Sequence, residues 1–309
     1  MGLAAARLIE RLNRQWEEVE GRLNVSFEFF PPNTADMEAT LWQSVKRLAR
    51  FQPAFVSVTY GAAASTRDRT HAVIERLVRE TDLTPVPHLT CISSTRDEIA
   101  QIIERYQALG IQHIVALRGD KPTDYQVPAD GFNYAVDLVH FLKLRGVKDI
   151  SVAAYPEVHP EAKSARADLD NLKAKVEAGA TRIITQFCFD NCAFLRFRDK
   201  CQSAGIDLPI TPGILPVTNF KQVQRFASGC GTKIPSWFEK VFDGLEEEPE
   251  TRRLIGCNFA FEQVKLLARE GVDDFHFYTL NRAELTFAIC HALGLAPAEK
   301  MQFATAVGF

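Results

Sequence analysis

The stretch NVSFEFF at residues 24–30 places one charged residue inside a run of apolar and aromatic residues. Side chains of a β-strand alternate between its two faces, so Ser26 and Glu28 share one face, whereas Val25 and Phe27 share the other. The apolar face suits packing against helices. The stretch therefore predicts a buried strand whose carboxylate points away from the helices that cover it.

Seven more short runs rich in β-branched and aromatic residues follow this strand. They are Phe55–Tyr60, Val86–Cys91, His113–Gly119, Ser151–Pro156, Arg182–Phe187, Pro209–Leu215 and Asp274–Leu280. Near-continuous apolar runs are typical of parallel strands covered on both faces. Amphipathic stretches alternate with them, and one opens with the capping-box pattern Thr95-x-x-Glu98.

Eight strands alternating with helices predict a single (β/α)8 TIM barrel of the α/β class, in which Glu28 faces the lumen. An open doubly wound sheet is the alternative, but the strand count and the length of 309 residues favour the barrel. We expect an extra N-terminal helix over Leu3–Val19 and about three additional helices between strands seven and eight, from Asn219 to Gly271. Without a linker or repeat, residues 1–309 read as one catalytic domain.

The composition excludes several classes of function. A net charge of -3 argues against a broad nucleic-acid surface. No apolar run approaches the roughly 18 to 20 residues of a membrane span, and Arg7 and Glu10 interrupt any signal peptide, so we expect a cytoplasmic protein. The seven cysteines are scattered without a Cys-x-x-Cys pattern, which predicts no metal site.

In a TIM barrel, the active site forms at the C-terminal ends of the strands. Glu28 lies in such a position, and burial among aromatic residues disfavours its charged form, which suits a general acid. The alternative is a structural carboxylate paired with a buried base.

The fourth strand ends in Arg118-Gly119-Asp120. Gly119 lets a ligand approach the backbone closely, and Asp120 is either functional or the cap of the next element. His159 follows the fifth strand and is either a ligand contact or an ordinary loop histidine. The strands contain no lysine, which disfavours Schiff-base chemistry, and no glycine-rich fingerprint follows a strand, so strand-end loops must hold any nucleotide.

Six ordered motifs together resemble the methylenetetrahydrofolate reductase family over residues 22 to 295. They are Ser26-Phe27-Glu28-Phe29-Phe30-Pro31-Pro32, Val58-Thr59-Tyr60-Gly61-Ala62, Pro87-His88-Leu89-Thr90-Cys91, Leu117-Arg118-Gly119-Asp120, Ala153-Ala154-Tyr155-Pro156-Glu157-Val158-His159-Pro160 and Phe275-His276-Phe277-Tyr278-Thr279-Leu280-Asn281-Arg282.

The resemblance implies a flavoenzyme of one-carbon metabolism and methionine biosynthesis. It implies that FAD reduces methylenetetrahydrofolate to 5-methyltetrahydrofolate, with NADH as the usual donor and NADPH as the alternative. Both substrates would take turns at one flavin face in a ping-pong cycle. The resemblance also suggests a homotetramer.

The same resemblance implies roles for individual residues. Glu28 would protonate a ring nitrogen of the folate and open the ring to an iminium, and Asp120 would lie between flavin and folate. Thr59 would help to bind NADH. The expected cofactor residues are Thr59, Tyr60, Ala62, His88, Arg118, Gly119, Asp120, Ala135, Tyr155, His159, Ala162, Asp168, Asn171 and Lys175. The expected substrate residues are Asp120, Gln186, Gln222, Phe226, Tyr278, Leu280 and Arg282.

Two other hypotheses remain at this point. A flavin barrel resembling proline dehydrogenase has no use for a protonated Glu28. A non-catalytic barrel that binds a metabolite or partner predicts no turnover.

Overall fold

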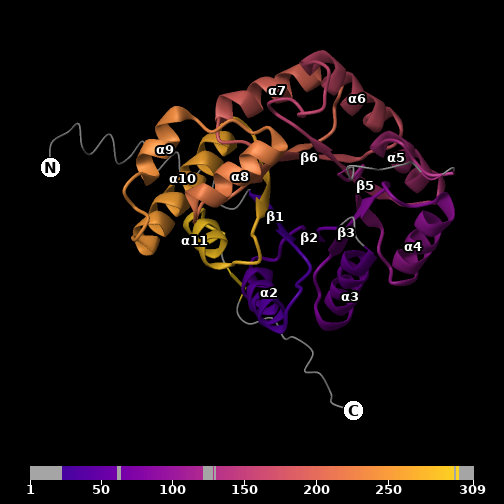
Figure 1. Cartoon of the computed structure of the whole chain (residues 1–309), viewed down its shortest axis with the longest axis horizontal. Coiled ribbons are helices and arrows are strands. Elements are labelled where there is room, and N and C mark those ends of the chain that lie inside the picture. The colour runs from indigo at the N-terminus through magenta and orange to yellow at the C-terminus, as the bar shows by residue number, and fades with distance from the viewer. Residues whose placement is uncertain (1–22, 61–63, 121–127, 129, 296, 299–309) are drawn as a thin grey trace, which may run out of the picture.

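The computed structural model describes residues 23–60, 64–120, 128, 130–295 and 297–298. Eight parallel strands close into a barrel in chain order, with helices around them (Figure 1). The strands are β1 (Asn24–Phe29), β2 (Phe55–Val58), β3 (Pro85–Thr90), β4 (His113–Leu117), β5 (Asp149–Ala154), β6 (Arg182–Phe187), β7 (Ile210–Ile214) and β8 (Asp274–Tyr278). The predicted TIM barrel is confirmed, and most strands end one or two residues earlier than predicted.

The helices cover the outside of the barrel. They are α2 (Ala35–Leu48), the short 3-10 helix η1 (Ala49–Phe51), α3 (Ala64–Glu80), α4 (Arg96–Ala108), α5 (Ala135–Leu144), α6 (Ala165–Glu177), α7 (Asn191–Ser203), α8 (Phe220–Cys230), α9 (Ser236–Phe242), α10 (Pro249–Arg269) and α11 (Glu284–Ala292). The three helices expected between strands seven and eight are α8, α9 and α10. The expected helix over Leu3–Val19 lies outside the described residues, within which no helix is long and apolar enough to cross a membrane.

Local signals explain where the helices begin. The predicted capping box of α4 is present: Thr95 accepts a hydrogen bond from the Glu98 backbone, and the Glu98 carboxylate accepts one from Thr95. Thr34 caps α2 with a single bond, because its side chain accepts a hydrogen bond from the Met37 backbone N–H.

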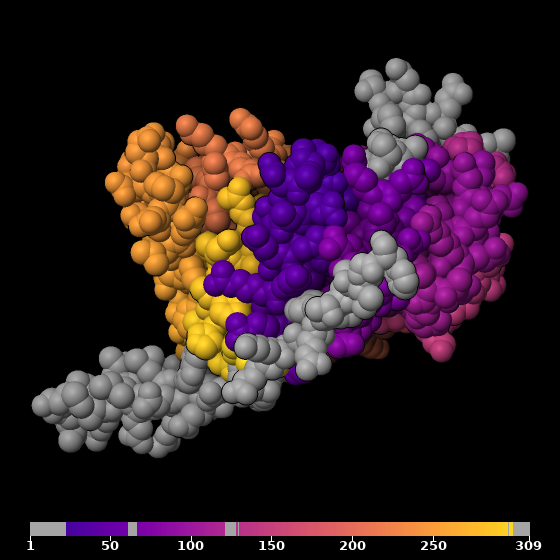
Figure 2. All heavy atoms as spheres, turned by 90° about the horizontal axis from the view of Figure 1, so that it is seen from below, coloured from indigo at the N-terminus to yellow at the C-terminus, as the bar shows by residue number. Residues whose placement is uncertain are grey.

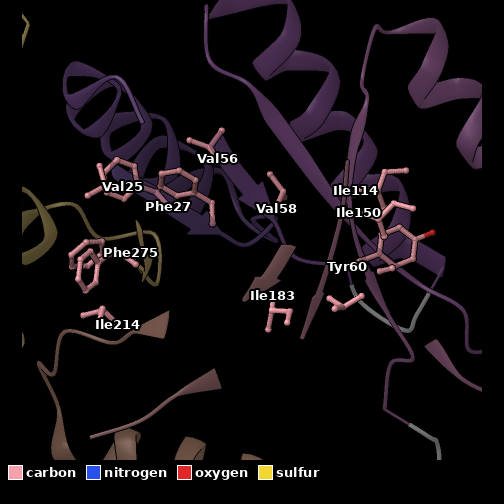
Figure 3. Packing of buried hydrophobic residues seen from close by; sticks show 14 of the residues in the cluster. Val25, Phe27, Val56, Val58, Tyr60, Ile114, Ile150, Ile183, Ile214 and Phe275 are labelled. Carbon is pink, nitrogen blue, oxygen red and sulfur yellow. The ribbon is translucent and has the colours of Figure 1, made fainter. Parts of the chain in front are cut away.

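The main core lies between the strands and the helices. Val25 and Phe27 of β1 pack there beside Val56 of β2 and Phe275 of β8 (Figure 3). The prediction that this face of the first strand packs against helices is therefore confirmed. The lumen holds a smaller apolar layer of Phe55, Val86, Val115 and Ile184.

The barrel closes where its first strand, β1, pairs with its last strand, β8. Ser26 lies opposite His276 in this pairing, and Glu28 lies opposite Tyr278. Outside the strands, α2 contacts α11, and the indigo and yellow parts of the chain touch in Figure 2. This closure brings together residues that are about 250 positions apart in the chain.

Helices α8 to α10 pack on the barrel through a second aromatic cluster that includes Phe189 and Phe238. The approach is close at Gly256 of α10, where an added Cβ would overlap the carbonyl oxygen of Val217. Gly229 of α8 is also helical, but nothing lies within 4 Å of the corresponding position.

We predict opposite effects for alanine at these two glycines. Gly256→Ala must displace α10 and should lower the free energy of unfolding by about 1–3 kcal/mol. Gly229→Ala should raise it by about 0.5 kcal/mol, because alanine is the better helix former. Urea unfolding of both variants tests this, and equal effects would contradict the close approach.

Candidate active site

Glu28 lies on the lumen face of β1, as predicted. Its Oε2 is 3.5 Å from His88 Nε2 and 3.7 Å from His276 Nε2, and 19% of its side chain is exposed. The expected aromatic surroundings are only partly correct. Phe27 and Phe29 belong to the outer core, on the other face of β1. The polar neighbours of the carboxyl group are the imidazole rings of His88 and His276.

His276 is a residue that sequence reasoning missed. Its ring is 1% exposed, and its Nδ1 lies 2.7 Å from Ser26 Oγ. Strand alternation places His276 and Tyr278 on one face of β8, but only the register with β1 shows that this face meets Glu28.

His88 approaches the carboxyl group from β3. Burial lowers the pKa of His88, and the nearby Glu28 opposes that change. His88 precedes Thr90 on the same face of the strand, and Thr90 lines the cavity described below. One face of β3 therefore carries both a neighbour of Glu28 and a residue of the cavity wall.

Asn281 fixes the ends of β1 and β8 to one another. The Phe30 N–H donates to Asn281 Oδ1 at 3.0 Å, and Asn281 Nδ2 donates to the Phe30 carbonyl at 2.8 Å. Leu280 and Asn281 both have left-handed backbones, with φ of 50° and 56°. Two such residues in succession store strain of a kind that gathers at functional sites, and they set where Leu280 and Arg282 lie.

A cavity of about 530 Å³ opens at the C-terminal ends of the strands. Eleven of the predicted cofactor residues line it. They are Tyr60, Arg118, Gly119, Asp120, Ala135, Tyr155, His159, Ala162, Asp168, Asn171 and Lys175. Ala62 lies outside the described residues, and Thr59 and His88 do not line this cavity.

Two basic side chains, those of Lys175 and Arg118, line the cavity. Burial lowers the pKa of Lys175 to about 8, and its Nζ donates to the Ala153 carbonyl at 2.6 Å. Arg118 makes a two-pronged pair with Glu161, at 2.7 and 2.8 Å. Glu161 also lines the cavity and was missed by sequence reasoning, because its pairing depends on how the loop after β5 folds.

The same wall has features that fit an extended polar ligand. Tyr60 Oη and Thr90 Oγ1 are buried and have no hydrogen-bond partner among the described residues. Gly119 has φ of 89°, and a Cβ there would meet Ile92 Cγ2 at 2.6 Å. The backbone beside Asp120 therefore requires glycine. Tyr155 and His159 meet edge to face with their centroids 4.5 Å apart.

The predicted substrate residues lie on several elements. Tyr278, Leu280 and Arg282 line a second cavity, of about 330 Å³, together with Arg253 of α10. Gln186 Oε1 accepts a hydrogen bond from its neighbour's backbone, that of Phe187. Asp120 lines the larger cavity, and Gln222 and Phe226 lie on α8.

Both α8 residues face solvent. Gln222 is exposed, and Phe226 is 38% exposed, unusual for a phenylalanine. The described contacts do not join either residue to Glu28 or to the larger cavity.

Comparison with known proteins places this geometry in a family. The family model described as methylenetetrahydrofolate reductase matches residues 11–294. The chain is 58% identical over 288 residues to the 5,10-methylenetetrahydrofolate reductase of Escherichia coli, covering 93% of this chain and 96% of that one. It is 59% identical to the Salmonella typhimurium protein of the same name, with the same coverage.

More distant likenesses agree with the fold. The chain is 36% identical to methylenetetrahydrofolate reductase (NADH) 1 of Arabidopsis thaliana, over 91% of this chain and 50% of that protein. A Clostridium thermocellum protein that binds two copies of 5-methyl-5,6,7,8-tetrahydrofolic acid has a similar structure. Its TM-score is 0.58 and its identity is 14%, over 92% of this chain and 97% of that one. At that identity, the likeness shows the barrel fold alone.

The family match and the high identity over nearly the full chain exclude both alternatives, a proline dehydrogenase-like barrel and a non-catalytic barrel. The chain belongs to the methylenetetrahydrofolate reductase family of oxidoreductases.

Proposed function

We propose that this chain reduces 5,10-methylenetetrahydrofolate to 5-methyltetrahydrofolate through bound FAD, with NADH as the reductant in a ping-pong cycle. Membership of the family supports the reduction of this folate. The cofactor, the reductant and the order of the cycle are our additions. The observation that carries the cofactor is the gathering of eleven expected cofactor residues around one cavity.

The cavity wall suits FAD. When bound, FAD supplies a carrier that takes a hydride from NADH and passes it to the folate. Lys175 and Arg118 are the cations that can meet its diphosphate. Arg118 must release the Glu161 carboxylate before it can bind the phosphate oxygens. Glu161 therefore competes with the cofactor for Arg118. Tyr60 Oη and Thr90 Oγ1 are unpaired polar atoms on the same wall.

Glu28 is suited to hold the proton that the folate reaction needs. The cyclic substrate accepts hydride poorly until a ring nitrogen is protonated and the ring opens to an iminium. No lysine or arginine forms an ion pair with Glu28 in the described part of the chain. Asp120 lines the cofactor cavity, where its charge opposes negative charge on the flavin ring and favours hydride release.

The remaining residues have simple roles in this proposal. Arg282 binds the carboxylate tail of the folate, and Phe226 offers a ring for stacking. Gln186 and Gln222 donate and accept hydrogen bonds with the pterin or its linker. The word NADH in the name of the Arabidopsis relative supports NADH as the donor. The homotetramer and the cytoplasmic location stay predictions.

The test of the proposal is Glu28→Gln, followed in each half-reaction separately. We expect the variant to bleach its flavin with NADH within about twofold of the wild-type rate, because that step needs no acid. Reoxidation by methylenetetrahydrofolate should fall by about 100-fold or more, the usual size of a general-acid contribution. Stopped-flow absorbance of the flavin measures both rates.

Glu104→Gln is the matched control, because Glu104 is an exposed carboxylate on α4 that pairs with Arg145. It should keep both rates. An equal fall of both half-reactions in Glu28→Gln would mean that Glu28 is structural, and a protein that takes up no FAD would contradict the proposal as a whole.

A second prediction concerns pH and FAD binding. Lys175 of the ligand-free protein loses its proton near pH 8, and a bound diphosphate favours the charged form. Binding therefore takes up a proton above pH 8, so the affinity should fall by about tenfold per pH unit between pH 8 and 9.5. Quenching of FAD fluorescence measures the dissociation constant.

Lys175→Gln should bind FAD more weakly and should lack this fall above pH 8. Lys173→Gln, two residues away on α6, should behave as the wild type. If the steep fall persisted in Lys175→Gln, another group would be the one that titrates.

A further inference from the structure

The loop after β5 contains a strained residue beside the cofactor cavity. This loop, residues 155–162 and called the cofactor loop below, contributes four residues to the cavity wall: Tyr155, His159, Glu161 and Ala162. Val158 lies in the middle of the loop with φ of 107°. A β-branched residue rarely adopts a positive φ, and such a backbone persists only where its surroundings hold it. The contacts on either side of Val158 therefore decide the shape of the loop.

Two hydrogen bonds flank Val158. On one side, the His159 N–H donates to Asp168 Oδ2 of α6 at 2.9 Å. On the other side, Glu157 Oε2 accepts the backbone N–H of Lys233 at 2.8 Å. Lys233 lies in the connection between α8 and α9. The cofactor loop is therefore fastened to α6 at one point and to the end of α8 at another.

The end of α8 also packs closely on this loop through residues 230–233, called the α8 turn below. Gly231 caps the helix with a left-handed backbone, at φ of 71°. An added Cβ there would lie 2.8 Å from Pro160 Cγ, so the two segments can be this close only with glycine at that position. The hydroxyl of Thr232 donates to the Phe187 carbonyl at 2.9 Å. The α8 turn thus contacts both the cofactor loop and the end of β6.

Three of the expected substrate residues are attached to the α8 turn. Gln222 and Phe226 lie on α8 itself, and Gln186 directly precedes Phe187 on β6. None of these three described residues lines the cofactor cavity. A helix moves as a rigid unit, so a shift of the α8 turn displaces Gln222 and Phe226 together. The α8 turn therefore connects the cofactor loop to residues that the cofactor cavity itself does not reach.

We propose that Glu157 is a positioning residue for the folate half-reaction: its bond to Lys233 ties the α8 turn to the cofactor loop, so the filled cofactor cavity sets where α8 meets the folate. The pair of Arg118 with Glu161 must open for the FAD phosphates, which leaves the two bonds beside Val158 to hold the loop. This inference rests on the proposed function, because it needs FAD in this cavity and folate against α8.

The kinetic test is Glu157→Ala in the holoenzyme, which removes the acceptor of the Lys233 N–H. We expect the KM for methylenetetrahydrofolate to rise by about tenfold, because α8 is no longer held in place before the folate binds. The value of kcat should stay within about twofold, since the reacting groups are unchanged. FAD should bind within about threefold of the wild-type dissociation constant, because Asp168 still holds the loop. Weaker FAD binding with an unchanged folate KM would mean that Glu157 serves the cofactor loop alone, and would overturn the proposal.

Two further variants separate the hydrogen bond from general effects. Glu157→Gln should keep the wild-type KM, because an amide oxygen can accept the same N–H. Glu98→Ala is the matched control: Glu98 Oε2 also accepts a backbone N–H, that of Thr95, at 2.8 Å, but at the start of α4. It should keep the wild-type KM as well. A rise in either variant as large as in Glu157→Ala would mean that lost charge, or any lost bond of this kind, is enough, and would overturn the proposal.

Hydrogen exchange of the backbone, followed by mass spectrometry, tests the tie without turnover. In the wild-type protein, loading with FAD should slow exchange in residues 220–233 by about fivefold and leave α11 unchanged. In Glu157→Ala, this slowing should be lost. Equal exchange of residues 220–233 with and without FAD in the wild type overturns the proposal, and so does a slowing that persists in Glu157→Ala.

Two outcomes distinguish this inference from the proposed function. If the wild-type protein takes up FAD and reduces methylenetetrahydrofolate, and Glu157→Ala keeps the wild-type folate KM, this inference fails alone. If the wild-type protein takes up no FAD, the proposed function fails and this inference with it.

Discussion

The pairing of β1 with β8 is the contact on which the rest of the site depends. It closes the barrel, sets Ser26 opposite His276 and sets Glu28 opposite Tyr278. Asn281 strengthens the closure by bonding both backbone groups of Phe30, and the buried hydroxyl of Ser44 donates to the Asn281 carbonyl at 2.7 Å. One junction thus positions the carboxyl group, its neighbour His276 and the loop that carries Arg282.

The barrel holds two regions that differ in their electrostatic environment. Around Glu28 lie the imidazole rings of His88 and His276, and no guanidinium or ammonium group pairs with the carboxyl group in the described residues. Around the larger cavity, Lys175 and Arg118 supply positive charge. A proton donor needs the first environment and an anionic cofactor needs the second. The barrel can offer both because different strand ends face each region.

The sequence was enough to predict the eight strands, because each run is short, apolar and bounded by turns or helical periodicity. Strand alternation was enough to turn Glu28 inward. The sequence was not enough to predict the partners of Glu28, because His276 meets it through the register between two strands about 250 residues apart. The pair of Arg118 with Glu161 was missed for a similar reason, because it joins the ends of β4 and β5 through a loop. The resemblance supplied candidate residues, and eleven of them share one cavity, but it could not supply their contacts.

The central claim is that Glu28 is a neutral acid when folate binds. Infrared difference spectroscopy of the holoenzyme at neutral pH, before and after methylenetetrahydrofolate is added, tests it most directly. The account predicts a protonated-carboxyl band that changes on binding and is missing from Glu28→Gln. If the difference between wild type and variant were confined to carboxylate bands, Glu28 would be ionised in the resting site, and the account would be contradicted.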